Sequence, residues 1–269
     1  MNRIWQWHFG RGIVRSANNF GLQGDRPTHP ELLDWLAAEF MKRGWRLKEM
    51  HRLILLSNAY QMSSAPQEDG LKVDPQNNLF WRFDMRRLRA EEIRDSILAV
   101  NQTLDAEKMF GPSIYPKIPD EVLAGQSRPG HNWFTSSEED ARRRSIYIHI
   151  KRSLPVPLLA AFDAPEADFT CPVRFATTQP TQALGMLNSD FMNKQAKLFA
   201  DSLHEHASLR KKVEVALQKV FQREPEQADI NDALGLIESL KKDHGQSDAD
   251  ALKNFCLLAL NLNEFVYLD

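Results

Sequence analysis

The fold is decided by residues 28–56, which read THPELLDWLAAEFMKRGWRLKEMHRLILL. Apolar residues recur there every three or four positions, a spacing typical of amphipathic helices. Thr28 and Glu31 have the spacing of a capping box, so we expect a helix to begin there. Gly44 favours the left-handed conformation that ends a helix. A second helix over 47–56 follows closely, which predicts an antiparallel helical hairpin.

The same periodicity extends through the chain and predicts a mainly α multi-helix domain. A small β element is expected near 144–150, because three isoleucines alternate there with polar residues. Residues 111–140 show no pattern, so long irregular loops are expected, and loops of that length are usually functional or disordered. Further helices are expected at about 1–9, 89–104, 180–187, 190–203, 209–221, 225–240 and 247–262.

Composition limits the classes of protein that fit. The 269 residues include 34 Lys and Arg against 36 Asp and Glu, with 42% hydrophobic residues. This balance is ordinary for a globular chain and gives no electrostatic case for nucleic acid or an anionic membrane as partner. No apolar run approaches the ~20 residues that a membrane span requires. The two cysteines, Cys171 and Cys256, leave one disulfide open.

The length suits a single helical domain over residues 1–269, with sub-lobes over 1–150 and 151–269 as an alternative division. The first residues, Met1 to His8, lack the basic and then apolar pattern of a signal peptide. An aromatic helix that begins at the first residue leaves no room for a cap. We therefore expect the chain to represent the later part of a longer fold and to lack upstream modules.

Several motifs in one order carry a family resemblance. They include Asn2–Gln6, His8–Gly12, Pro27–Leu36, Gly44-Trp45, Arg86–Glu91, Arg143–Tyr147 and Thr178–Leu184. With them the chain resembles the planctomycete-type C-terminal domain of unknown function, the domain of unknown function 1553 family. The resemblance implies an exported or periplasmic protein, an upstream cytochrome c-like module and a second uncharacterised domain as partners. Haem would belong to that upstream module, and no cofactor is expected in this chain.

The resemblance supplies no reaction, because the family has no established one. The chain also departs from the family pattern at Trp7, where the first of two adjacent histidines usually stands. No histidines in the sequence have chelating spacing, so no metal site is predicted.

The strongest candidate site is the polar, glycine-rich loop before residue 30. Asp25 and His29 are suited to acid/base chemistry beside a helix start that attracts anions. The alternative is that these polar groups cap the helix and hold the loop, which is their commoner use. Candidate ligand-binding residues, for an anionic glycan, are Arg26, Arg86, Arg87 and Arg143, together with Trp133, which is expected to be exposed in the patternless segment. The arginines have acidic neighbours in the sequence, so ion-pair networks are the alternative.

Two functions remain open from the sequence. The first is a non-catalytic binding or assembly module that associates with the upstream domains that the resemblance implies. The second is an enzyme or enzyme subunit acting on an anionic polysaccharide. In that case Asp25 and His29 would transfer protons, while Arg86, Arg87 and Arg143 would hold the substrate.

Overall fold

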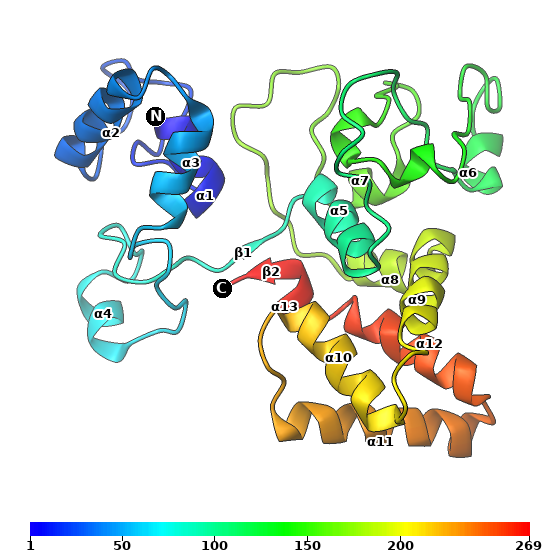
Figure 1. The fold of residues 1–269 in the computed structure, drawn as a ribbon. Coiled ribbons are helices and arrows are strands. Elements are labelled where there is room, and N and C mark those ends of the chain that lie inside the picture. Colours follow the sequence, from blue (N-terminus) through cyan, green and yellow to red (C-terminus); the bar gives the residue numbers. More distant parts are fainter. The chain divides into compact units, whose positions relative to one another are not determined.

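The protein is mainly helical, as its sequence predicts. The structure, a computed structural model, describes all residues from 1 to 269. It contains 13 helices, which account for 49% of the chain, and one two-stranded antiparallel β element (Figure 1). The chain forms two compact units, which we call unit 1 (residues 1–87 and 267–269) and unit 2 (residues 88–266). The single domain over 1–269 and the sub-lobes at 1–150 and 151–269 stay predictions.

Unit 1 holds four helices and both strands. Strand β1 pairs antiparallel with β2, with Arg86 opposite Leu268 and Arg87 opposite Tyr267. The first and last segments of the sequence therefore belong to the same unit. The elements are α1 (Asn2–Phe9), α2 (Pro30–Lys42), α3 (Leu47–Leu55), α4 (Glu68–Val73), β1 (Arg86–Arg87) and β2 (Tyr267–Leu268).

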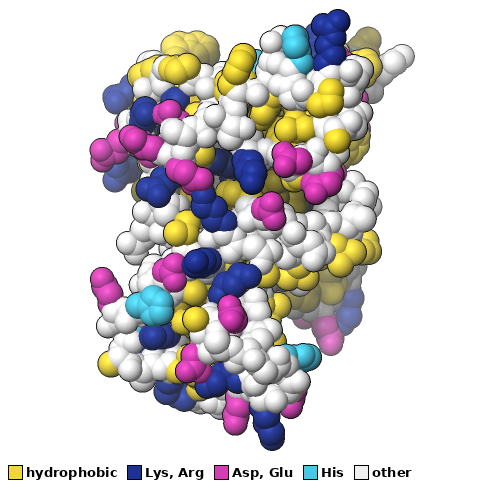
Figure 2. Space-filling view, turned by 90° about the vertical axis from the view of Figure 1, so that its right-hand side faces the viewer, with side chains coloured by type: hydrophobic (Ala, Val, Ile, Leu, Met, Phe, Trp, Pro, Cys, Tyr) yellow, Lys and Arg dark blue, Asp and Glu magenta, His cyan; other side chains and the backbone are white.

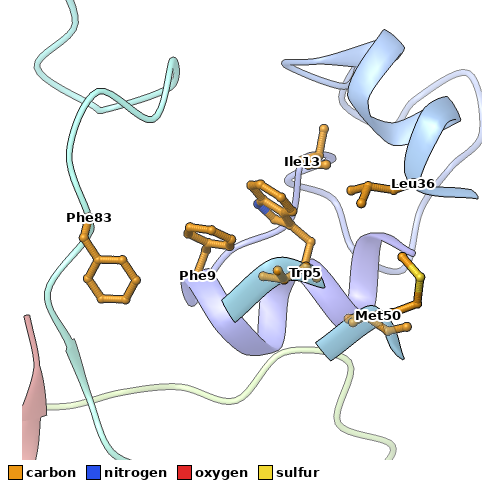
Figure 3. Packing of buried hydrophobic residues seen from close by; sticks show 8 residues of the cluster. Trp5, Phe9, Ile13, Leu36, Met50 and Phe83 are labelled. Carbon is orange, nitrogen blue, oxygen red and sulfur yellow. The ribbon is translucent and has the colours of Figure 1, made fainter. Parts of the chain in front are cut away.

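The core of unit 1 is built around the aromatic face of α1. The ring of Trp5 stacks on that of Phe9, with 4.1 Å between ring centroids (Figure 3). Ile13, Leu36 and Met50 bring the following loop, α2 and α3 onto this pair. The helical hairpin expected from the sequence is thus held against α1 by one buried apolar cluster.

The start of α2 differs from the predicted capping box. The helix begins at Pro30, with His29 at the N-cap position and no side-chain cap. The backbone amide of Thr28 donates to the Ile13 carbonyl at 3.0 Å, and its hydroxyl donates to the same oxygen at 3.3 Å. Thr28 therefore ties the preceding loop to the core. Proline at the first helical position, with its fixed φ, suits the helix start without such a cap.

Unit 2 contains nine helices and two short 3-10 turns. Helix α12 packs on α9 and α11, and α10 packs on α11 and α12. Ser189, Ser208 and Ser247 cap α9, α10 and α12 by accepting from backbone amides. The helices are α5 (Ala90–Val100), α6 (Asp120–Ala124), α7 (Pro157–Ala161), α8 (Pro180–Asn188), α9 (Asp190–Ser202), α10 (Leu209–Phe221), α11 (Gln227–His244), α12 (Asp248–Ala259) and α13 (Asn263–Val266), and the 3-10 turns are η1 (Asp140–Arg142) and η2 (Ser145–Tyr147).

The β element expected near 144–150 is not there, and that prediction of its position was wrong. Ser145–Tyr147 form the 3-10 turn η2, and Ile148 makes only an isolated bridge to Ile114. The alternating isoleucines do not share a buried face, since Ile146 is 72% exposed and Ile148 is 7% exposed. Polar side chains of α5 take the backbone groups that a strand would use, as described below.

Two further sequence expectations concern single features. Cys171 is exposed and Cys256 is buried, and both are free thiols, so the disulfide that the sequence left open is not formed. Burial raises the pKa of the Cys256 thiol to about 12, so this thiol is an unreactive core residue. None of the helices combines the length and apolar character needed to cross a bilayer.

Candidate functional site

The predicted acid/base pair lies in unit 1, in the loop that leads into α2. The backbone amide of Asp25 donates to the Ser16 hydroxyl at 2.8 Å, while the side chains of Asp25 and Arg26 are exposed. His29 Nδ1 lies 3.0 Å from the Thr28 hydroxyl. No hydrogen bond joins Asp25 to His29. The hydrogen bonds to Ser16 and Thr28 hold the loop in place, which is the structural alternative that the sequence left open.

The loop over residues 74–84 is bound to this loop by two arginines, Arg11 and Arg15, which were not among the candidates from the sequence. Arg11 donates to the carbonyls of Gln76 and Asn77 at 2.7 Å each and pairs with Asp84 at 2.5 Å. The guanidinium of Arg15 lies 5.9 Å from the centroid of the Phe80 ring. These contacts span more than sixty residues of sequence, so only the folded chain reveals them.

Two of the candidate ligand-binding arginines lie on β1. Arg86 Nε donates to the carbonyl of His8 at 3.2 Å, which ties the strand to α1. Arg87 is buried. Both side chains are therefore integrated into the packing of unit 1.

Arg143, in unit 2, is buried to 1% exposure. Its Nη1 donates to the Pro112 carbonyl at 2.8 Å, its Nη2 donates to the Phe110 carbonyl, and its Nε lies 3.4 Å from the Lys108 carbonyl. The guanidinium also lies over the Tyr147 ring, 4.2 Å from its centroid. Because all three guanidinium nitrogens of Arg143 are directed at backbone carbonyls, this side chain holds the surrounding loop in place.

Arg94 and Asp95 on α5 form a second buried network with the same segment. Arg94 donates to the carbonyl of Arg143 at 3.2 Å and to the Ser145 hydroxyl at 3.1 Å. The Asp95 carboxylate accepts from the Ser145 amide at 2.8 Å and from its hydroxyl at 2.6 Å. Burial lowers the pKa of Arg94 to about 10, partly offset by Asp95. This network replaces the ladder that a strand would form near Ser145.

Trp133 is buried, so the expectation that it is exposed was wrong. Its ring packs with Ile118 and Leu154, and its Nε1 donates to the Pro116 carbonyl at 3.0 Å. A buried indole normally needs such a partner. Trp133 therefore anchors the segment without a regular pattern to a small apolar cluster in unit 2.

Two histidine side chains, His8 on α1 and His51 on α3, are in direct contact. Nε2 of His8 lies 2.8 Å from Nδ1 of His51, and the edge of the His8 ring meets Tyr60. Burial, followed by the nearby His51 and Arg86, lowers the pKa of His8 to about 4. No third side chain of a metal-ligating type joins the two histidines. The two rings are joined by one hydrogen bond between ring nitrogens.

The connection between α2 and α3 exposes three large apolar side chains. We call Met41, Trp45 and Leu47 the apolar tip, and they are 53%, 65% and 51% exposed. The backbone is left-handed at Gly44 (φ 66°), as the sequence predicts, and also at Trp45 (φ 61°). Trp7 and Trp35 are exposed as well, but less than Trp45. The sequence signal for the exposure of Trp45 is its position directly after Gly44, the glycine expected to end the helix.

Charges of both signs are mixed on the face of the molecule that Figure 2 shows. Figure 2 shows Lys and Arg side chains intermingled with Asp and Glu over the visible surface. Together with the capped helices and the buried arginine networks, this surface defines a multi-helix protein of mixed charge.

The family model described as Protein of unknown function (DUF1553) matches residues 1–237, and the chain belongs to this family. The match covers all of unit 1 up to β1 and ends within α11. Comparison with curated proteins and with solved structures finds no match.

Proposed function

We propose that this protein is a non-catalytic binding or assembly module that docks on a partner protein through the apolar tip. The observation that carries the proposal is the exposed Trp45. A bulky residue in the left-handed region costs roughly 1–2 kcal/mol, and an exposed ring returns little of that cost through burial. Tryptophan is among the residues most enriched at the centres of protein interfaces.

Local contacts hold the Trp45 ring in place. Its backbone amide donates to the Phe40 carbonyl at 2.9 Å, and its ring meets the Phe40 ring edge at 5.2 Å between centroids. A ring fixed in this way loses little conformational entropy on binding, which favours affinity.

The apolar tip is surrounded by charge. Residues 42–48 include four basic side chains and no acidic one, while Glu39 and Glu49 flank the segment. Arg43 contacts both, at 3.0 Å from Glu39 and 3.8 Å from Glu49. An apolar centre with a polar rim is the usual anatomy of a protein interface. The excess of positive charge favours a partner with an acidic rim.

The partners that fit the family resemblance are the upstream cytochrome c-like module and the second uncharacterised domain. They would lie on a separate chain or on a longer precursor. Haem would be bound by that upstream module and not by this chain. The same resemblance supports an exported or periplasmic location in a planctomycete-type protein.

A binding measurement between this protein and the two upstream domains tests the proposal. We expect saturable association, weakened at least about tenfold by Trp45→Ala, because truncation of an interface tryptophan commonly costs ~2 kcal/mol. Phe175→Ala is the matched control, since Phe175 is an aromatic residue 81% exposed in unit 2. Absence of association, or equal effects of the two variants, would contradict the proposal. Circular dichroism should show that both variants remain folded.

The enzyme acting on an anionic polysaccharide stays the alternative from the sequence. It requires Asp25 and His29 to act together, and their hydrogen bonds to Ser16 and Thr28 give this no support. It also requires donors from Arg143, which are directed at backbone carbonyls. Asp25→Asn, assayed with sulfated glycans, remains the direct test of that function.

A further inference from the structure

A hollow in unit 2 has a lining unlike that of the apolar tip. Its volume is about 420 Å³, and it lies between the segment after α6 and the segment that follows Ile150. We call it the basic pocket. Its principal lining residues are Gln126, Ser127, Arg128, His131, Lys151 and Ser153.

The lining has two basic side chains and a histidine but no carboxylate. Some other cations of this unit have acidic partners. Arg152, next to the pocket in sequence, pairs with Asp168 at 3.2 Å, and Lys108 pairs with Asp140 at 2.7 Å. Arg128 makes no ion pair. Unbalanced Arg and Lys side chains in one hollow favour an anionic ligand, and the guanidinium fork suits a tetrahedral oxyanion.

The neutral groups of the lining suit hydroxyls. Gln126 Nε2 donates to the Ser153 carbonyl at 2.9 Å, which fixes the amide. Gln126 Oε1 is buried and has no partner in the chain. Because this oxygen has almost no accessible surface, a ligand does not reach it, and the serines are the neutral groups that a ligand can meet. Ser127 and Ser153 add hydroxyls that donate and accept.

The two segments of the pocket are held by the core beneath them. Trp133, two residues after His131, packs with Leu154, the residue after Ser153. The Lys151 ammonium donates to the carbonyl of His131, which links the two sides of the hollow. One donor of the ammonium is used in this way, and two remain for a ligand. A site held by core packing loses less entropy on binding.

From this lining we propose that the basic pocket binds the sulfate or phosphate ester of a sugar. The oxyanion lies against Arg128 and Lys151, and the sugar hydroxyls lie against Ser127 and Ser153. The volume exceeds that of a single inorganic anion and falls in the range of small-molecule pockets, ~300–1,000 Å³. This binding activity is separate from docking through the apolar tip, which lies in unit 1.

Calorimetric titration of the full chain tests the proposal with five probes: glucose 6-sulfate, glucose 6-phosphate, glucose, inorganic sulfate and inorganic phosphate. At least one ester should bind saturably and at least about tenfold more tightly than glucose or either inorganic ion. The ester that binds more tightly identifies the oxyanion. Failure of both esters to saturate, or equal binding of an inorganic ion or of glucose, overturns the proposal.

Variants locate the binding. Arg128→Gln and Lys151→Met should each weaken the ester about tenfold. Arg152→Gln is the matched control, because Arg152 is adjacent in sequence but does not line the pocket. Arg128 is exposed and carries no ion pair, so its loss should leave the fold intact by circular dichroism. Unchanged affinity in Arg128→Gln, or an equal loss in the control, overturns the assignment.

Discussion

At the scale of single residues, burial and hydrogen-bond partners separate arginines that look alike in the sequence. Arg143 and Arg144 are neighbours, yet Arg143 is buried among carbonyls and Arg144 is exposed. No sequence periodicity distinguishes them, because the carbonyls come from the irregular segment 108–112. The sequence could therefore nominate Arg143 as a special residue, but it could not tell that the role is structural.

We predict that Arg143→Met destabilises the protein by about 3–5 kcal/mol, because buried carbonyls lose a charged donor. Arg143→Lys should be intermediate, since an ammonium cannot reproduce the fork. Urea unfolding measures both. Arg144→Met should change the free energy of unfolding by less than ~0.5 kcal/mol, as is usual for exposed positions. Similar losses at the two positions would show that the carbonyl contacts of Arg143 are unimportant.

We predict that His8 makes the stability of the protein depend on pH. Its pKa in the folded state is about 4, below the ordinary value of 6.5. Between these values the unfolded chain binds a proton that the folded chain does not, so stability falls as pH drops from about 6.5 towards 4. A shift of this size could contribute at most about 3 kcal/mol to the free energy of unfolding. Because His8 is only half-buried, we expect a contribution of about 1–2 kcal/mol.

The measurement is urea unfolding at pH 7.5 and at pH 5.0 for the natural chain and for His8→Gln. In the variant, the free energy of unfolding should differ less between the two pH values than it does in the natural chain. His204→Gln, at an exposed histidine, should keep the full difference. If His8→Gln keeps it as well, the pH dependence comes from another group.

At the scale of helices and loops, the predictions succeeded where one apolar face repeats over three turns or more. The helices expected at 190–203 and 209–221 match α9 and α10 within one residue at each end. Short helices such as α7 and α13 were missed, because five residues or fewer carry too little periodicity. The strand expected near 144–150 failed for another reason. The backbone of this segment is hydrogen-bonded by charged side chains of α5, and a local sequence pattern cannot predict such a long-range contact.

The serine caps of unit 2 offer a test at this scale. Ser189 accepts from the Met192 amide at 3.0 Å, at the start of a helix that packs on α12. Ser189→Ala should lower the free energy of unfolding by about 1 kcal/mol. Ser239→Ala, within α11, removes a hydroxyl that donates to the exposed side chain of Asp243 at 2.8 Å but removes no cap, and it should cost clearly less. Equal effects in thermal or urea unfolding would show that the cap adds nothing.

At the scale of the whole molecule, the chain path is unusual, because unit 2 lies in sequence between two parts of unit 1. The chain leaves unit 1 after Arg87 and returns to it at Tyr267. The pairing of β1 with β2 joins residues about 180 positions apart in the sequence. Neither strand is longer than two residues, so a sequence pattern had no means to predict this pairing.

This path predicts that the last residues of the chain stabilise its first helices. Leu268 packs against the same apolar cluster as Trp5 and Phe9, and β2 supplies the only strand partner of β1. Deletion of residues 267–269 removes that apolar contact and the strand pairing, together worth about 1–2 kcal/mol. Amide hydrogen exchange in α1 should then become about tenfold faster, provided that exchange follows the opening of unit 1. Exchange in α9 and α12 should be unchanged, since they belong to unit 2. Deletion of Asp269 alone is the control, because Asp269 is exposed and lies beyond the paired residues. If α1 is as well protected without residues 267–269 as with them, the closure of unit 1 by the end of the chain contributes nothing to its stability.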